Sequence, residues 1–522
     1  MTIVEMLARN ARTYPDETAL VELKPSQKIR REITWRVFDE RANRIANSLA
    51  ARGVGKGDKV LHLMLNSINW LEAYFGILKT GAWAVPLNFR FTSADIKYCA
   101  DIAEAKVMIL GPEFAERVEA IRSKLPSIKD YIFVGKNVPQ DMESFEDIIE
   151  KASAEPLSIP LTADDECGLY FTSGTTGEPK PILLTHKNME CAAVTEAKHH
   201  YQQRDDNFVL IPPMYHTGAK MHWFGNLLVG ARATILTEME PKAVFEAVEQ
   251  ERGTIVWLPV PWVQDILSAL DREELKLKDY DLSSWRLMHM GAQPIPPSLI
   301  KRWKQYFPDM QYDTSYGLSE ATGPGCVDLG IENSHKLEAT GKAGFNWEVR
   351  VVDEKGNELK RGEVGELTVK GNGVMKCYYK NPKKTAETLR DGWLYTGDMA
   401  KMDDKGFFYI VDRKKDVIIT GGENIFPVEL ESVIQKHLKV HDVGVIGLPD
   451  ERLGEIACAV ISPRDGADLT EDEINEFCEQ NLPRYKRPRR IIFDKVPRNP
   501  TGKIEKPKMR QKYSGAKGSF KI

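Results

Sequence analysis

The chain has 522 residues, of which 42% are hydrophobic and 28% are charged, and its formal net charge is −4. This length exceeds what one hydrophobic core usually serves, so we expect about three folding units, or one large composite domain plus a smaller one. The slightly acidic charge excludes a chain that binds nucleic acid through an overall positive surface, and no nucleic-acid partner is expected.

The cysteines are scattered along the chain and form no C-x-x-C pair: Cys99, Cys167, Cys191, Cys326, Cys377, Cys458 and Cys478. Reduced structural thiols are therefore expected, not a disulfide framework or a metal site. The first residues lack the basic region and apolar core of a secretory signal, and no run reaches the roughly 18 apolar residues of a spanning helix. We expect a cytoplasmic protein without an integral membrane segment.

The first half of the chain alternates helical and strand patterns. Apolar residues at helical spacing predict one helix that stops at residues 14–15 and a second that ends at Gly53. Short apolar runs at 59–64 and 82–87 predict strands with a helix between them. This β-α-β rhythm predicts an α/β fold with layers of helices and largely parallel sheets.

The rhythm changes between residues 340 and 412, where three short runs at 347–352, 365–370 and 406–411 predict a compact β subdomain. The charged run at 412–416 follows, and α/β alternation then resumes. We therefore expect a large N-terminal domain over residues 1–412, a connection at 413–416 and a small α+β C-terminal domain over 417–522.

A loop rich in hydroxyl groups and glycines follows an apolar strand at 167–171 and ends at Lys180. Gly174 and Gly177 permit positive φ angles and close approach of the backbone, so amide groups can converge on an anion to which Lys180 adds charge. The loop lacks the spacing of a Walker A motif, and a plain surface turn is the alternative. Pro181 removes an amide donor directly after Lys180, which affects the path of that side chain.

Further motifs follow this loop in order: residues 213–218 (PMYHTG), 291–294 (GAQP), 316–320 (YGLSE), 395–398 (YTGD), 413–424 (RKKDVIITGGEN) and 500–503 (PTGK). Taken singly, each also fits a turn cap, a packed aromatic ring or a solvated acid. Together they resemble, across nearly the whole chain, the signatures of the adenylate-forming superfamily of acyl-CoA synthetases, adenylation domains and beetle luciferase. The pattern looks closest to medium-chain or carnitine-type acyl-CoA ligases, although the family's loop usually continues Pro-Lys-Gly.

The resemblance implies a catalytic role for three residues. Lys503 would bridge the substrate carboxylate and the α-phosphate of ATP as charge spreads in the transition state, and His216 would border the acyl site. Glu320 would offer a hard oxygen ligand to a Mg²⁺ ion that bridges ATP phosphates, with Thr172 as the second protein ligand.

The residues expected to hold ATP or CoA lie in the same motifs. By the resemblance, Asp398 would accept both ribose hydroxyls, Tyr316 would stack on adenine, and Arg413 would hold ribose or phosphate. The full expected set is Thr172, Ser173, Gly174, Thr175, Thr176, Gly177, Lys180, Gly291, Ala292, Gln293, Pro294, Asp313, Thr314, Ser315, Tyr316, Gly317, Ser319, Asp398, Arg413, Gly421, Gly422 and Glu423.

The acid to be activated is expected to be short, medium-chain, alicyclic or aromatic, because bulky side chains surround the motif at 213–218. The expected acyl-pocket residues are Tyr215, His216, Lys220, Trp223, Met290, Gly291, Gly317, Leu318, Thr322 and Pro324.

The implied reaction has two halves. A carboxylate attacks the α-phosphate of Mg-ATP to give acyl-AMP and pyrophosphate, and a thiol then displaces AMP to give a thioester. In this family the small C-terminal domain rotates between the halves, which implies a mobile lid with its hinge at Lys415. The rotation would withdraw Lys503 and bring Gly422 to the wall of a pantetheine tunnel.

Free coenzyme A is the expected acceptor because the chain carries no appended carrier module. A stand-alone adenylation enzyme that loads a carrier protein is the alternative, and a luciferase-like oxygenase or a non-catalytic binding protein is less favoured. The expected partners are a small carboxylic acid, ATP, Mg²⁺ and CoA. A homodimer and a lysine acetyltransferase that acts on Lys503 are further expectations.

Overall fold

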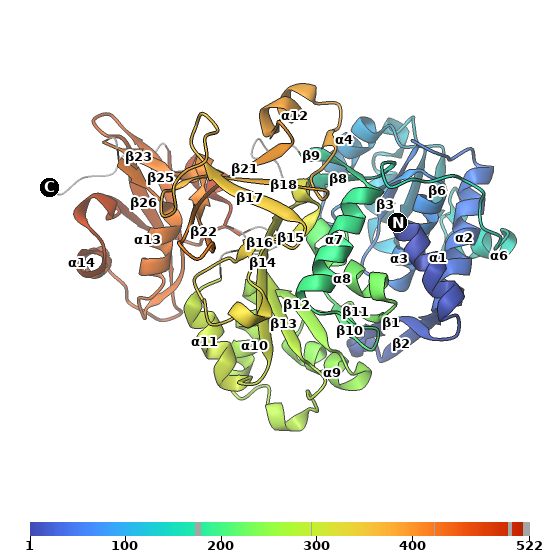
Figure 1. Cartoon of the computed structure of the whole chain (residues 1–522), viewed down its shortest axis with the longest axis horizontal. Coiled ribbons are helices and arrows are strands. Elements are labelled where there is room, and N and C mark those ends of the chain that lie inside the picture. The colour runs from blue at the N-terminus through green and yellow to red at the C-terminus, as the bar shows by residue number, and fades with distance from the viewer. Residues whose placement is uncertain (173–178, 294, 422, 499–503, 515–522) are drawn as a thin grey trace.

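The computed structural model describes residues 1–172, 179–293, 295–421, 423–498 and 504–514, which form four β-sheets and the helices that cover them (Figure 1). The first helix, α1 (Ile3–Thr13), begins at a capping box in which Thr2 and Glu5 satisfy each other's backbone amides. It ends before Tyr14, as the sequence predicts.

The first sheet has eight strands in the order β19-β9-β8-β4-β3-β5-β6-β7. Its strands are β3 (Lys59–Leu63), β4 (Trp83–Pro86), β5 (Val107–Leu110), β6 (Asp130–Phe133), β7 (Glu143–Ser144), β8 (Glu166–Thr172), β9 (Lys180–Thr185) and β19 (Cys377–Tyr378). In this order, neighbouring strands from β8 through β7 pair in parallel. The strands β9 and β19 at the other edge pair in antiparallel fashion. The parallel strands β4 and β5 are buried throughout, which is why each reads as a continuous apolar run.

The second sheet has nine strands in the order β16-β15-β14-β13-β12-β10-β11-β1-β2. Its strands are β1 (Thr18–Lys24), β2 (Ile29–Thr34), β10 (Asn207–Leu210), β11 (Arg232–Leu236), β12 (Ile255–Pro259), β13 (Leu287–Gly291), β14 (Gln311–Leu318), β15 (Gly323–Asp328) and β16 (Lys342–Ala343). Pairs from β1 to β14 are parallel, and the strands at both edges are antiparallel. The motifs at 291–294 and 316–320 therefore lie at the ends of two neighbouring parallel strands.

Three helix layers separate and cover these two sheets (Figure 1). One buried cluster joins a face of each sheet through α1, α2 (Trp35–Ala51), α3 (Ile68–Lys79), α6 (Phe145–Lys151), α7 (His186–His199) and α8 (Thr217–Val229). The other face of the second sheet packs on α9 (Pro241–Glu251), α10 (Val260–Asp271) and α11 (Pro297–Tyr306). The other face of the first sheet packs on α4 (Ser93–Ala103) and α5 (Ala115–Glu119).

The third sheet is antiparallel and has a hydrophobic cluster of its own. It contains β17 (Trp347–Val352), β18 (Gly365–Gly371), β20 (Leu389–Arg390), β21 (Trp393–Met402) and β22 (Phe408–Arg413), with α12 (Pro382–Thr388) beside it. The strand β22 begins two residues later than the predicted run and ends at Arg413, which pairs with Asp398 on β21. Arg413 thus belongs to this sheet, and the connection that follows is the 3-10 turn η7 (Lys414–Asp416).

The fourth sheet lies at the C-terminal end of the chain (Figure 1). It contains β23 (Ile418–Thr420), β24 (Glu423–Ile425), β25 (Val440–Asp450), β26 (Gly454–Pro463) and β27 (Arg490–Phe493), with α13 (Pro427–Ile434), α14 (Glu471–Asn481) and α15 (Lys506–Tyr513). This mixed α/β arrangement of a large N-terminal and a small C-terminal part confirms the predicted fold class; the exact domain bounds stay a prediction. Within the described ranges, no helix combines the length and hydropathy that a membrane crossing needs.

Candidate active site

The loop predicted to bind an anion joins β8 to β9 as a hairpin. Thr172 at the end of β8 pairs in register with Lys180 at the start of β9, so these residues hold the two ends of the loop. Pro181 is accommodated within β9, where its carbonyl accepts a hydrogen bond from the Tyr379 amide at 2.9 Å. The expected phosphate contacts within the loop lie outside the described residues: Ser173, Gly174, Thr175, Thr176 and Gly177.

Lys180 and Glu320 lie close enough for their charges to interact. Partial burial lowers the pKa of Lys180, and the Glu320 carboxylate acts in the opposite direction. Glu320 lies in the 3-10 turn η5 (Ser319–Ala321), and its Oε1 accepts a hydrogen bond from the Tyr378 hydroxyl at 2.8 Å. Its Oε2 has no hydrogen-bond partner within the described part of the chain. An ammonium group and a carboxylate with one free oxygen suit the binding of a magnesium polyphosphate.

The motif at 395–398 holds its carboxylate between a phenol and a guanidinium. Asp398 is 4% exposed; its Oδ2 accepts from the Tyr316 hydroxyl at 2.5 Å and its Oδ1 lies 2.7 Å from Arg413 Nε. The turn before it uses Gly397 at a φ of +73°, a left-handed conformation that favours glycine. The Thr396 hydroxyl accepts from the Asp398 amide at 3.1 Å, which fixes the turn.

The Asp398 carboxylate favours the protonated forms of both of its partners. Burial and the Asp398 carboxylate raise the pKa of the Tyr316 phenol, and the same carboxylate raises the pKa of Arg413. The Tyr316 phenol and the Arg413 guanidinium therefore both contact the Asp398 carboxylate and hold it in place. A carboxylate held in this way can accept hydrogen bonds from the two hydroxyls of a ribose.

Replacing Asp398 by asparagine is expected to raise the KM for ATP at least about tenfold, because charge-assisted hydrogen bonds are worth about 1.5–3 kcal/mol each. The measurement is pyrophosphate release at saturating acid over a range of ATP concentrations. Asp403→Asn is the matched control, since Asp403 caps a turn of the same sheet through backbone amides. An unchanged KM for ATP in Asp398→Asn would contradict this role.

The turn at 291–294 begins at a glycine that packs closely against an indole ring. A Cβ on Gly291 would lie 3.1 Å from Trp257 Nε1. Ala292 has a φ of +69°, so the chain turns sharply after β13, and Gln293 is partly exposed. Pro294 lies outside the described residues.

The segment at 213–218 leads directly into α8. His216 is the N-cap residue of that helix, its ring centre lies 4.2 Å from that of Tyr215, and Tyr215 meets Phe89 edge-on at 5.5 Å. The Thr217 hydroxyl lies 3.1 Å from the Ser319 hydroxyl. The acyl-side segment is thus joined to the turn that carries Glu320.

Two of the expected pocket residues pack into the core between α8 and α3. Trp223 is fully buried, with its ring 6.3 Å from Phe75. Lys220 is fully buried as well; its Nζ donates to the Met214 carbonyl at 3.2 Å and lies 4.3 Å from the Tyr170 ring centre. Successive residues of a helix are about 100° apart around its axis, so a different residue of α8 faces the second sheet.

Three of the remaining expected pocket residues lie at or just after the end of β14. Gly317 is exposed, Leu318 is half-buried, and Thr322 takes a φ of +65° and donates its hydroxyl to the Gly373 carbonyl at 2.5 Å. Met290 faces the opposite side of the second sheet, in the cluster with α10 and α11. The side chain of Pro324 is not among those described.

The connection to the fourth sheet brings further cations to the site. Burial lowers the pKa of Lys415; Asp416 opposes this shift, whereas Arg413, Arg510 and Lys180 reinforce it. Asp416 is ion-paired with Arg510 on α15 at 2.7 Å. Lys180, Arg413 and Lys415 thus gather where polyphosphate is expected. Gly421 and Glu423 are exposed, and Gly422 and Lys503 lie outside the described residues.

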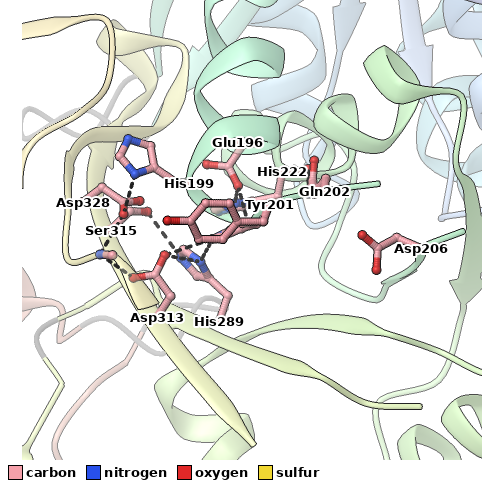
Figure 2. A network of polar contacts seen from close by, with 12 residues as sticks. Glu196, His199, Tyr201, Gln202, Asp206, His222, His289, Asp313, Ser315 and Asp328 are labelled. Carbon is pink, nitrogen blue, oxygen red and sulfur yellow. Dashed lines mark hydrogen bonds and ion pairs between the residues drawn. The ribbon is translucent and has the colours of Figure 1, made fainter. Parts of the chain in front are cut away.

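A buried polar network that the sequence did not predict joins α7 and α8 to β13 and β14 (Figure 2). His200 Nδ1 is ion-paired with Glu196 Oε2 at 3.1 Å, and its Nε2 contacts Asp313 Oδ2 at 3.1 Å and His289 Nδ1 at 2.7 Å. The same Glu196 oxygen lies 2.6 Å from His222 Nδ1.

Asp313, which was expected to contact nucleotide, belongs to this network. It is fully buried, and its second oxygen accepts from the Gly330 amide at 3.0 Å. Burial alone would lower the pKa of His200, but the Glu196 and Asp313 carboxylates raise it to about 10. The histidine doublet at 199–200 is the sequence signal that could have pointed here, although its partners lie up to 113 positions away.

Comparison with known proteins identifies the family. The family model described as "AMP-binding enzyme" matches residues 7–379, and "AMP-binding enzyme C-terminal domain" matches residues 429–503. The chain belongs to the AMP-binding enzyme family. This membership confirms the predicted superfamily and the prediction of an ATP-dependent, AMP-forming ligase.

Individual relatives of this AMP-binding enzyme span nearly its whole length. A feruloyl-CoA synthase of an Amycolatopsis species is 36% identical over 92% of this chain and 94% of its own. A long-chain-fatty-acid–CoA ligase of Mycobacterium tuberculosis is 33% identical over 98% of both chains. Among solved structures, an anthranilate CoA ligase in complex with anthranoyl-AMP superposes with a TM-score of 0.88 at 27% identity, covering 98% of this chain and 97% of its own.

Proposed function

We propose that the protein is an acyl-CoA ligase for a short, medium-chain, alicyclic or aromatic carboxylic acid. The acid's carboxylate attacks the α-phosphate of ATP to give acyl-AMP and pyrophosphate, and the thiol of CoA then displaces AMP. The observation that carries the proposal is the convergence of Lys180, Glu320 and Arg413, which come from three segments far apart in sequence and interact electrostatically at one place.

In the first half-reaction these residues would position the nucleotide. Arg413 and Tyr316 present Asp398 to the ribose hydroxyls, and Lys180 and Lys415 offset the charge of the phosphates. Glu320 would hold the Mg²⁺ ion, with Thr172 at the end of β8 as its second ligand. The metal supplies Lewis-acid stabilisation of charge on the phosphate oxygens.

In the second half-reaction the acyl-adenylate must stay in place while the thiol enters. The connection η7 is one short turn, so few φ and ψ angles need to change for the fourth sheet to rotate. We propose that Lys415 is the hinge and that residues 421–423 then border the thiol's path. Acetylation of Lys503 would remove the charge needed in the first half-reaction and is proposed as a regulatory modification.

Replacing Lys415 by proline is expected to leave acyl-AMP formation measurable and to lower thioester formation about 10²-fold, because a fixed φ obstructs the rotation and small misplacements cost that much. The two rates are measured separately, as pyrophosphate release and as acyl-CoA formation from supplied acyl-AMP. Lys415→Ala is the control, since it removes the charge but leaves φ free. Equal losses in both halves, or none, would contradict the hinge.

The proposed function as a whole is tested by pyrophosphate release over a panel of carboxylic acids, with and without CoA. We expect release that depends on acid, followed by AMP and acyl-CoA once CoA is added. Acid-dependent pyrophosphate release with no acyl-CoA product would indicate a carrier-protein acceptor. No release with any acid would overturn the proposal.

A further inference from the structure

The buried network lies on the same face of the second sheet as the turn at 291–294. Along β13, Met288 and Met290 pack on α10 and α11, whereas His289 contacts the network on the side of α7 and α8. Side chains alternate along a strand, so Gly291 shares the face of His289 and lies about 7 Å further along. The network therefore lies next to Gly291 on the same face of the sheet, one step back along β13.

The protonation pattern of this network is fixed by its contacts. The Glu196 and Asp313 carboxylates each lie 3.1 Å from a ring nitrogen of His200, and they raise its pKa to about 10, which favours the cation with a proton on both nitrogens. Its Nε2 lies 2.7 Å from His289 Nδ1, so this nitrogen of His289 must accept. The proton of His289 is then on Nε2, which lies 3.3 Å from the Ser315 hydroxyl (Figure 2).

His222 links the network, through Trp257, to the turn at 291–294. Its Nδ1 lies 2.6 Å from the carboxylate of Glu196, an acceptor, so Nδ1 carries the proton. The imidazole stacks on Trp257 with ring centres 4.9 Å apart, and the indole N–H of Trp257 is the group that a Cβ on Gly291 would touch. His222 Nε2 has no hydrogen-bond partner among the described residues, although the side chain is 2% exposed.

A metal ion does not fit this cluster of histidines. The nitrogens of His200 and His289 are 2.7 Å apart, which is a hydrogen-bond distance. Two nitrogens on one tetrahedral zinc ion, at about 2.0–2.1 Å each, would be separated by roughly 3.3 Å. Each ring nitrogen of His200 also has a carboxylate oxygen 3.1 Å away, so these nitrogens interact with acids and are not free to bind a metal ion.

We propose that His222 determines the acid specificity of the enzyme: its Nε2 accepts a hydrogen bond from a hydroxyl or amino group on the ring of the acid. This inference rests on the proposed acyl-CoA ligase function and names the substrate class. His222 and Trp257 stack on each other next to Gly291, so an acid that reaches His222 Nε2 meets aromatic surface, which favours an aromatic ring. A long alkyl chain would have to end against ionised groups, which is unfavourable without hydrogen bonding.

The test uses sets of acids in which the ring hydroxyl is present, capped by a methyl group or absent. We would measure kcat/KM of acyl-CoA formation for 3- and 4-hydroxybenzoate and 4-hydroxycinnamate, each beside its methyl ether and its unsubstituted parent. We expect at least one hydroxy acid to exceed its methyl ether at least about tenfold in the unmodified enzyme. In His222→Phe, which keeps the ring stacked on Trp257, this ratio should fall to near one while the parent acid is still activated.

A second variant keeps the test informative if His222→Phe does not fold. His222→Gln retains an acceptor oxygen and should keep part of the preference for the hydroxy acid, which a purely structural role of His222 would not explain. Two results would overturn the inference about His222 but not the proposed function. One is turnover of all the acids with no preference for the hydroxy acids. The other is the same ratio of kcat/KM, hydroxy acid to methyl ether, in the unmodified enzyme and in both variants. No pyrophosphate release with any acid would overturn the proposed function and this inference with it.

Discussion

Glu320→Gln should lower acid-dependent pyrophosphate release about 10²–10³-fold, because a metal clamp on the phosphates would lose its anionic ligand. Glutamine keeps the size of the side chain and can still accept from the Tyr378 hydroxyl, so the turn η5 should keep its conformation. The rate is measured at saturating ATP across a range of Mg²⁺ concentrations. The Mg²⁺ concentration needed for half-maximal rate should rise in the variant.

The control for Glu320→Gln is Glu246→Gln, since Glu246 is ion-paired with Lys242 on α9, which packs on the other face of the second sheet. That variant should keep the rate and the Mg²⁺ dependence of the unmodified protein. If Glu320→Gln also kept both, Glu320 would not be a metal ligand, and its carboxylate would serve only to anchor Tyr378.

The second large effect is expected at Lys503. Lys503→Ala should lower acyl-AMP formation about 10³-fold, because a cation that bridges carboxylate and α-phosphate stabilises charge that develops only in the transition state. Thioester formation from supplied acyl-AMP should stay largely unchanged, since the proposed rotation of the lid would withdraw this residue. The two rates are measured by pyrophosphate release and by acyl-CoA formation from synthetic acyl-AMP.

Lys508→Ala is the matched control for Lys503→Ala. Lys508 follows Lys503 in the sequence and lies on α15; its ammonium is ion-paired with Glu505 and largely exposed, so its loss should affect neither half-reaction. Equal loss of both rates in Lys503→Ala would indicate damage to the lid instead of a missing charge. Full adenylation activity would remove Lys503 from the mechanism.

Local sequence patterns predicted much of the fold. The buried parallel strands β3 and β4 read as apolar runs, and α1 carries both a capping box and a proline shortly after its end. The limits of β22 were harder to predict, because Asp412 and Arg413 look like a charged linker. The sheet includes them because Arg413 pairs with Asp398 across the strands, a partner distant in sequence.

Some residues of the candidate site could likewise be predicted from the sequence, and others could not. Asp398, Glu320 and Lys180 lie in motifs with turn and strand signals, and the structure brings Lys180 close to Glu320. The contacts of His222 could not be predicted, because single histidines have no periodicity and Glu196 and His289 lie on other elements. Trp223 was expected in the pocket because it is bulky and follows the motif at 213–218. Its packing against Phe75 depends on how α8 is oriented about its own axis, which the sequence does not show.

The central claim is that a carboxylate oxygen attacks the α-phosphate of ATP. Its most direct test uses an accepted acid labelled with ¹⁸O in both carboxylate oxygens, with ATP, Mg²⁺ and CoA, followed by mass spectrometry of the products. The account predicts that AMP carries one ¹⁸O atom from the acid and that pyrophosphate carries none. Label in inorganic phosphate or pyrophosphate, or acyl-CoA formation with unlabelled AMP, would contradict it.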